Sequence, residues 1–228
     1  NYLLAGLLSG KAIRPAVSPR IWLGAPNSIK GPTEVVFHRQ SGNNLLLVGQ
    51  RDEAILAIVS IGLLALAAQF PRDAPRFVVC DSSAPGSPGR EYLERIVQAI
   101  PHSVTLAKAG DLPDIMKGLA DEMTRRTEDP AGGDAPPVFI FIHGLQRFTK
   151  LRWEEDFGFS APDPDAPPNP ALLLNNLLTE GTRYGFHVIA SCDSYNNLNR
   201  YLSRKALTEF ELRVLCQMSA NDSATLID

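Results

Sequence analysis

The hydrophobic positions of this chain fall into short continuous runs, separated by longer stretches in which apolar residues recur with a helical period. An apolar run without alternation is typical of a strand that is covered on both faces of a parallel sheet. Such runs occupy residues 44–49, 76–81, 103–106, 138–142, 187–192 and 210–215. The stretches between them predict helices at about residues 52–69, 90–99, 112–127, 170–183 and 196–207. Strands that alternate with helices predict an α/β fold, with a mostly parallel sheet and helices on both faces.

Two regions depart from this pattern. Residues 1–40 contain short β-prone pieces that glycines and prolines interrupt, so we expect a β-rich lead-in that packs on a main domain of residues 41–228. Residues 153–170 are rich in proline, aspartate and alanine. This second region is either a partner-binding segment or a mobile surface insertion.

Composition limits the class of protein. The chain has 228 residues, of which 44% are hydrophobic, and a formal net charge of -3. This charge argues against a strongly basic nucleic-acid binder, although a local patch could still contact DNA. The odd number of cysteines (Cys80, Cys192 and Cys216) fits reduced thiols in the cytoplasm. The apolar run at 54–68 is shorter than the roughly 18 residues of a membrane span, so it reads as a core helix. We expect a cytoplasmic segment of a longer protein, which could be membrane-tethered elsewhere.

Several segments carry a more specific signal when they are taken in chain order. They are residues 44–49, 76–81, 121–126, 138–144, 185–191 and 219–223. Their order and spacing resemble the motor domain of the FtsK/SpoIIIE and HerA group, which includes the ATPase modules of type VII secretion. The most specific match is Gly-Phe-His-Val-Ile-Ala-Ser at 185–191, which is similar to the family's Gly-Ile-His-Val-Ile-Ala-Thr sensor strand. The resemblance implies a RecA-like P-loop NTPase fold over residues 40 to 228.

The first departure from the family lies where a Walker A loop would stand. A working loop needs glycines around the phosphates, a lysine for the β/γ-phosphates and a Ser/Thr for Mg²⁺. The sequence here is Gly49-Gln50-Arg51-Asp52-Glu53, which has neither the lysine nor the hydroxyl and is several residues short. We expect Asp52 or Glu53 to cap the following helix and to repel a triphosphate. Arg51 is either a stand-in for the lysine or a solvent-facing loop residue.

The second departure lies at the Walker B position. Coordination of Mg²⁺ there needs a carboxylate at the end of the strand. His143 takes this place, and no acid follows before Glu154. We interpret His143 as a structural residue at the strand end, and Ser191 as the equivalent of the sensor residue. Asp81, at the end of a neighbouring strand, either caps a turn or supplies an isolated acid.

Three arginines have alternative interpretations. In ring-shaped motors an arginine of one subunit can complete the site of its neighbour. Arg183 is a candidate for this role, although an arginine at a helix C-terminus also complements the helix dipole. Arg125 and Arg126 read first as a solvated helix end and second as a partner contact.

We therefore expect a non-catalytic FtsK-like module of a larger ATP-driven translocase or secretion machine, acting in assembly or partner recruitment. No catalytic residue, metal or cofactor is expected; ATP and Mg²⁺ would bind only if the divergent site works. The expected partners are other ATPase modules in an oligomer, with DNA or a secreted protein as further candidates. The alternatives are an ATP-binding translocase domain with a divergent site and a free-standing interaction domain.

Overall fold

A computed structural model describes residues 2–9, 18–25, 29, 31–153 and 168–227. Six parallel strands form the main sheet, in the order β5-β4-β6-β7-β3-β8. Their bounds are β3 (Leu45–Val48), β4 (Arg76–Asp81), β5 (Ser103–Ala107), β6 (Val138–His143), β7 (Phe186–Cys192) and β8 (Leu212–Leu215). The predicted α/β class with a parallel sheet is confirmed.

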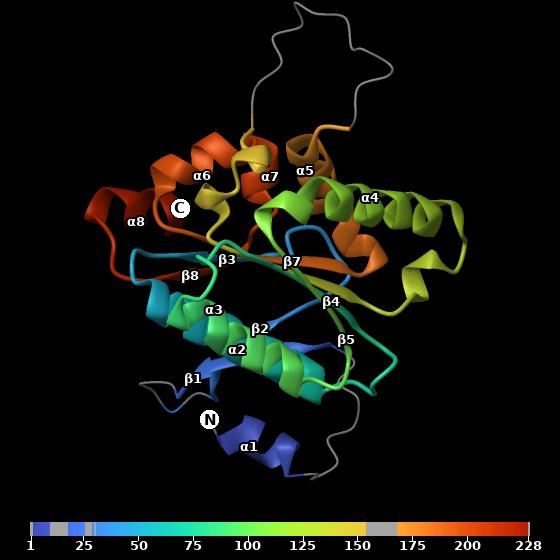
Figure 1. Cartoon of the computed structure of the whole chain (residues 1–228), viewed down its shortest axis with the longest axis horizontal. Coiled ribbons are helices and arrows are strands. Elements are labelled where there is room, and N and C mark those ends of the chain that lie inside the picture. The colour runs from blue at the N-terminus through green and yellow to red at the C-terminus, as the bar shows by residue number, and fades with distance from the viewer. Residues whose placement is uncertain (1, 10–17, 26–28, 30, 154–167, 228) are drawn as a thin grey trace, which may run out of the picture.

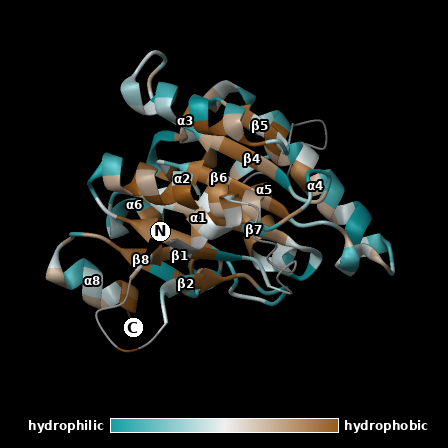
Figure 2. Cartoon of the chain, turned by 90° about the horizontal axis from the view of Figure 1, so that it is seen from below, coloured by the Kyte–Doolittle hydropathy of each residue, from teal (hydrophilic) through white to brown (hydrophobic). Residues whose placement is uncertain are grey.

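Helices cover both faces of this sheet, as Figure 1 shows. On one face lie α2 (Asp52–Ala68) and α3 (Pro88–Ala99); on the other lie α4 (Leu112–Glu128), α5 (Pro170–Glu180), α6 (Tyr195–Tyr201) and α7 (Arg204–Thr208). A short helix, α8 (Ala220–Ile227), lies at the edge beside β8. Hydrophobic residues concentrate in the strands and polar ones on outward-facing turns of helices such as α4 (Figure 2). Two large apolar clusters result, one on each side of the sheet.

The N-terminal part of the chain packs outside α2. Strands β1 (Arg20–Gly24) and β2 (Thr33–Val36) form an antiparallel pair, and Ile21 and Val35 join the apolar cluster below the sheet. Residues 2–8 form a helix, α1 (Tyr2–Leu8), whose Leu4 packs with Trp22 and Ala65. The sequence predicted only extended pieces here, and α1 corrects that expectation. The division of the chain at residues 40 and 41 stays a prediction.

The helices near the C-terminus differ from their predicted bounds. The expected helix at 196–207 is two helices, because the hydroxyl of Ser194 accepts from Asn197 N–H and that of Ser203 accepts from Ala206 N–H. Each serine caps a separate helix start. The expected helix at 170–183 ends at Glu180, and a 3₁₀ turn, η5 (Gly181–Tyr184), carries Arg183. No helix in the described part of the chain is long and apolar enough to cross a membrane.

The connections between strands change sides at the carboxyl ends of β3 and β7. From β3 the chain passes below the sheet through α2 to β4, whereas from β7 it passes above through α6 and α7 to β8. β3 and β7 are neighbours, so the chain leaves their carboxyl ends toward opposite faces. A switch point of this kind is where ligands bind in doubly wound folds. Gly49, His143 and Ser191 all lie at this edge, at or next to the ends of their strands.

Candidate functional site

The connection between β3 and α2 is very short. β3 ends at Val48 and α2 begins at Asp52, so only Gly49, Gln50 and Arg51 lie between them. The Walker A pattern from its first glycine to its Ser/Thr covers about eight residues, whose amides surround the phosphates. Three residues are too few to form such a loop. Gln50 and Arg51 are exposed. The carbonyl of Arg51 accepts from Ile55 N–H at 3.1 Å, but its guanidinium makes no hydrogen bond or ion pair with the described residues.

An ion pair lies over the first turn of α2. Asp52 binds the guanidinium of Arg147 from the segment after β6, with 2.5 Å between Arg147 Nη2 and Asp52 Oδ2. The N-cap position is Arg51, which makes no side-chain capping bond, so the predicted capping by Asp52 or Glu53 is wrong. Both acids instead stand in the first turn, where they complement the helix dipole. A phosphate at this helix end would meet two carboxylates and a paired arginine.

Gly49 is held closely between its neighbours. Its N–H donates to Cys192 O at 3.0 Å, and a Cβ at this position would lie 2.5 Å from Cys216 Cβ. Only glycine fits such an approach. Burial raises the pKa of the Cys192 thiol to about 12, so this thiol stays protonated. Gly49 therefore serves the packing of β3 against β7 and β8.

A buried charged cluster occupies the ends of β4 and β6. His143 Nδ1 lies 3.0 Å from Asp81 Oδ1, and Arg90 Nη1 of α3 lies 3.2 Å from Asp81 Oδ2. Ser83 donates to the same Oδ1 through its N–H and its hydroxyl, so Asp81 does cap a turn. The Asp81 side chain is 0% exposed, and that of His143 is 3% exposed. Burial alone would raise the pKa of Asp81, but the hydrogen bonds from His143 and Ser83 outweigh it and lower the pKa to about 2.

The turn after β6 is fixed to the end of β7. Gly144 has φ +75°, and its N–H donates to Ser191 Oγ at 2.8 Å. The backbone oxygen of His143 accepts from Ser82 Oγ at 2.7 Å. Ser191 is thus buried with its hydroxyl oxygen engaged by the protein. A hydrogen bond therefore joins the turn after His143 to Ser191 of β7.

The arrangement offers little to Mg²⁺ or to an attacking water. A magnesium site needs carboxylate oxygens that can face the ion. Both oxygens of Asp81 are already bonded to cationic or hydrogen-bond-donating groups. No group of three or more His, Cys, Asp or Glu residues that could hold a metal occurs among the described residues.

The sequence analysis missed three contacts of this edge. It found no acid paired with His143, although Asp81 is the acid, and it did not single out Arg90 or Arg147. Asp81 and His143 are 62 positions apart and meet only because β4 and β6 are neighbours. Arg90 has one local signal, the spacing to Glu94 that allows their 2.7 Å ion pair on one helix face. Arg147 has no local signal.

The arginines at the opposite edge lie far from these groups. Arg183 is exposed on η5 at the amino end of β7, whereas Ser191 is near its carboxyl end, about 20 Å away along an extended strand. Arg183 therefore cannot reach the candidate site of its own chain. Arg125 is exposed as expected, but Arg126 is not: its Nη1 donates to Tyr184 O at 2.8 Å, and its guanidinium lies 4.5 Å from the Phe186 ring centre. The interpretation of Arg126 as a solvated helix end is wrong.

A separate cavity lies beside Trp153. Residues 154–167, where the sequence predicts either a partner-binding segment or a mobile surface insertion, lie outside the described residues. A cavity of about 700 Å³ lies between Trp153 and the helices α6, α7 and α8, with Leu202, Leu207, Arg204 and Arg213 in its walls. None of the predicted site residues lines it.

Comparison with known proteins supports the fold. No protein-family model matches the chain, and neither does any curated protein. Among solved structures, EssC (ATPases 2 and 3) from Geobacillus thermodenitrificans matches 94% of this chain at a TM-score of 0.63 and 10% identity. The cytoplasmic domain of the Thermomonospora curvata type VII secretion ATPase EccC matches 92% at a TM-score of 0.57 and 14% identity. Thermomonospora curvata EccC (ATPases 2 and 3) in complex with a signal sequence peptide matches 88% at a TM-score of 0.57 and 13% identity.

These matches cover only part of the larger proteins. The chain spans 40%, 24% and 36% of the three solved chains, respectively. At such low identity the similarity establishes the fold alone, which is that of the ATPase domains of EssC and EccC. The RecA-like P-loop fold predicted from the sequence is confirmed.

Proposed function

We propose that this chain, which has the fold of the ATPase domains of EssC and EccC, is a non-catalytic module of a larger ATP-driven secretion-type machine. The observation that carries the proposal is the connection of Gly49, Gln50 and Arg51 between β3 and α2. This three-residue connection is too short to surround a triphosphate, and the Asp52–Arg147 ion pair lies at the helix end where phosphate would bind. We infer that nucleotide has no functional site on this chain.

The end of β6 supports the same conclusion. His143 replaces the expected acid and is held by Asp81, whose charge Arg90 balances in turn. A buried carboxylate with two such partners would lose them on turning toward a metal ion, at a cost of several kcal/mol. We infer that the cluster is a structural replacement for the magnesium site.

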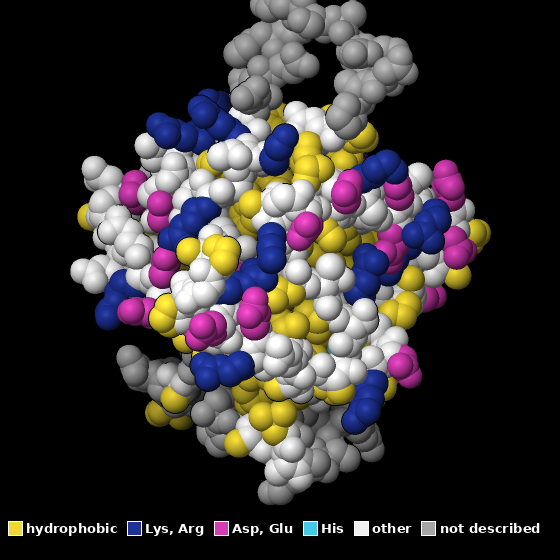
Figure 3. Space-filling model, in the orientation of Figure 1, with side chains coloured by type: hydrophobic (Ala, Val, Ile, Leu, Met, Phe, Trp, Pro, Cys, Tyr) yellow, Lys and Arg dark blue, Asp and Glu magenta, His cyan; other side chains and the backbone are white. Residues whose placement is uncertain are grey.

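The role we propose is assembly or partner recruitment. Two of the matching structures are described as containing ATPases 2 and 3, and one was solved with a signal sequence peptide. We propose neighbouring ATPase modules as the first partner class and a secreted polypeptide as the second. Acidic and basic side chains are interspersed on the face seen in Figure 3, which suits protein contacts better than DNA. The exposed Arg183 would be available to the site of a neighbouring module.

A phosphate-release assay separates this proposal from its alternative, a divergent but working translocase domain. The purified chain is incubated with ATP and Mg²⁺, in parallel with Arg51→Ala and with Arg95→Ala, a control that removes an exposed arginine of α3. The proposal predicts background phosphate release from all three proteins. Release above background that Arg51→Ala abolishes and Arg95→Ala preserves would establish the alternative.

A further inference from the structure

A second cavity lies at the amino ends of the strands, at the edge of the sheet opposite the candidate site. Its volume is about 320 Å³, near the lower end of the range of ligand pockets. Phe37, Phe70, Pro19 and Pro137 give it apolar walls. Its polar residues are Ser18, His38, Arg39 and His187, and the first two are bonded to each other, with 3.0 Å between Ser18 Oγ and His38 Nδ1. The proposed function makes no use of this cavity or of His187.

His187 is held in one orientation and one tautomer. Its ring is 2% exposed, stacks on Phe139 at 5.7 Å and 23°, and lies 5.2 Å from the ring of Phe37. Nδ1 lies 3.0 Å from the carbonyl oxygen of Asn43, and because a carbonyl only accepts, Nδ1 carries the proton. Burial lowers the pKa of His187 to about 4, so the ring is neutral at pH 7.

The other ring nitrogen is therefore an acceptor without a partner. In a neutral imidazole protonated at Nδ1, Nε2 presents a lone pair. No described residue donates a hydrogen bond to Nε2 of His187, and the residue forms part of the cavity wall. A ligand that supplies a donor to this nitrogen gains a hydrogen bond that no described residue makes.

The rest of the lining selects the kind of donor. No acidic residue lines the cavity, and its one arginine, Arg39, already donates to the carbonyls of Gly133 and Ala135. A cationic ligand would meet the positive charge of Arg39 with no carboxylate to balance it. The aromatic and proline walls favour a flat apolar ring. The complementary group is an uncharged ring with one hydroxyl.

We propose that this cavity binds a phenolic ring whose hydroxyl donates to Nε2 of His187. The ring could come from a free phenol or from the tyrosine side chain of a partner polypeptide, since both present the same group. The inference does not depend on the proposed function, because the cavity and the candidate site lie at opposite edges of the sheet.

The test is a set of titrations of the intact chain with matched probes. These are p-cresol, 4-methylanisole, which keeps the oxygen but lacks the donor, and N-acetyltyrosinamide. The ¹⁵N resonance of His187 Nε2 is followed by long-range ¹H–¹⁵N correlation. We expect p-cresol to shift this resonance and to bind about tenfold more tightly than 4-methylanisole, the ratio that one good hydrogen bond provides. Tyrosinamide binding at least as tight as that of p-cresol would assign the site to a polypeptide, and weaker binding would assign it to a free phenol.

A variant locates the effect. His187→Phe keeps a ring of similar size on Phe139 but removes the acceptor, and we expect it to bind p-cresol and 4-methylanisole equally. If the variant does not fold, the comparison of the two probes on the natural chain still decides. Equal affinity for both probes on the natural chain, or the absence of binding, would overturn the proposal.

Discussion

Two buried ionisable residues differ in charge at pH 7: Asp81 is ionised and His187 is neutral. Asp81 is charged because His143 and Ser83 bond to it, whereas His187 is neutral because burial penalises its cation and only one carbonyl compensates. Both pKa values are lowered, so the unfolded chain binds more protons than the folded chain in each case. The stability each contributes is therefore lost as the pH falls. The pH range of this loss differs between the two residues: it is about pH 6.5 to 4 for His187 and about pH 3.8 to 2 for Asp81.

The titration of His187 should make the free energy of unfolding depend measurably on pH. From pH 7 to pH 4.5 we expect the titration of His187 to lower the free energy of unfolding by about 2–3 kcal/mol, because the pKa of His187 falls from 6.5 to about 4 on folding. Urea unfolding at the two pH values measures this loss. His187→Phe should remove most of the difference, whereas His38→Gln, which changes an exposed histidine, should keep it. A pH dependence that survives in His187→Phe would show that the histidine is not its source.

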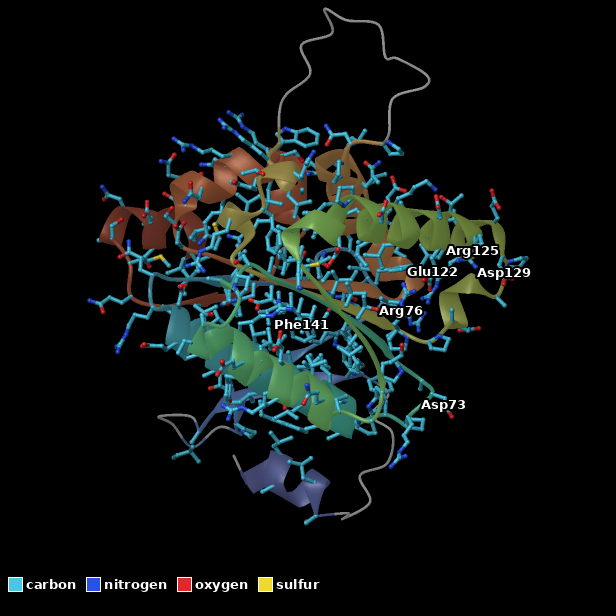
Figure 4. The ribbon with its side chains drawn as sticks, in the orientation of Figure 1. Asp73, Arg76, Glu122, Arg125, Asp129 and Phe141 are labelled. Carbon is cyan, nitrogen blue, oxygen red and sulfur yellow. The ribbon has the colours of Figure 1, made fainter. Side chains whose placement is uncertain are left out.

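At the scale of the elements, α4 is tied to the sheet by one acid. Glu122 lies 2.6 Å from Arg76 of β4 and 2.6 Å from Arg126 one turn along its own helix. Figure 4 shows Arg76 and Glu122 together, with Arg125 and Asp129 at the outer end of α4. Arg126 continues the contact to Tyr184 and Phe186 at the start of β7. The segment that carries the family resemblance at 121–126 thus joins three elements.

Replacement of Glu122 can be compared with replacement of an acid in an exposed ion pair on the same helix, because the Glu122 contacts are partly buried. We expect Glu122→Gln to lower the free energy of unfolding by about 1–3 kcal/mol, because two arginines lose their counter-charge in a partly buried site. Asp121→Asn removes the exposed pair between Asp121 and Lys117, whose side chains are 59% and 56% exposed, and should leave the free energy of unfolding almost unchanged. Chemical denaturation of both variants provides the comparison. Equal losses would mean that the Glu122 contacts do not tie α4 to the sheet.

The sequence predicted the elements of the main sheet well because their signals are local. A buried parallel strand is a continuous apolar run, and β6, buried at each of its six positions, gives the clearest example. The prediction of a single helix at 196–207 was wrong because Ser194 and Ser203 each cap the start of a separate helix. The residue type alone does not show whether a serine such as Ser203 caps a helix or lies within one. Helix α1 was missed because its packing on Trp22 and Ala65 comes from other elements.

At the scale of the whole molecule, the candidate site shows where sequence reasoning ends. The short connection at Gly49 and the loss of an acid at His143 are visible in the sequence, because both are matters of residue type and spacing. The Asp81–His143 and Asp52–Arg147 pairs are not, because strand order decides which loops meet. Asp52 was expected to satisfy the helix amides, and it instead pairs with an arginine 95 positions away.

The most direct test of the central claim is a calorimetric titration of the purified chain with a non-hydrolysable ATP analogue and Mg²⁺. We predict no binding at millimolar nucleotide, because the connection before α2 cannot surround phosphates and Asp81 is bonded to His143 and Arg90. Micromolar binding that disappears in Arg51→Ala would contradict it, and the chain would then be a divergent but working ATPase domain.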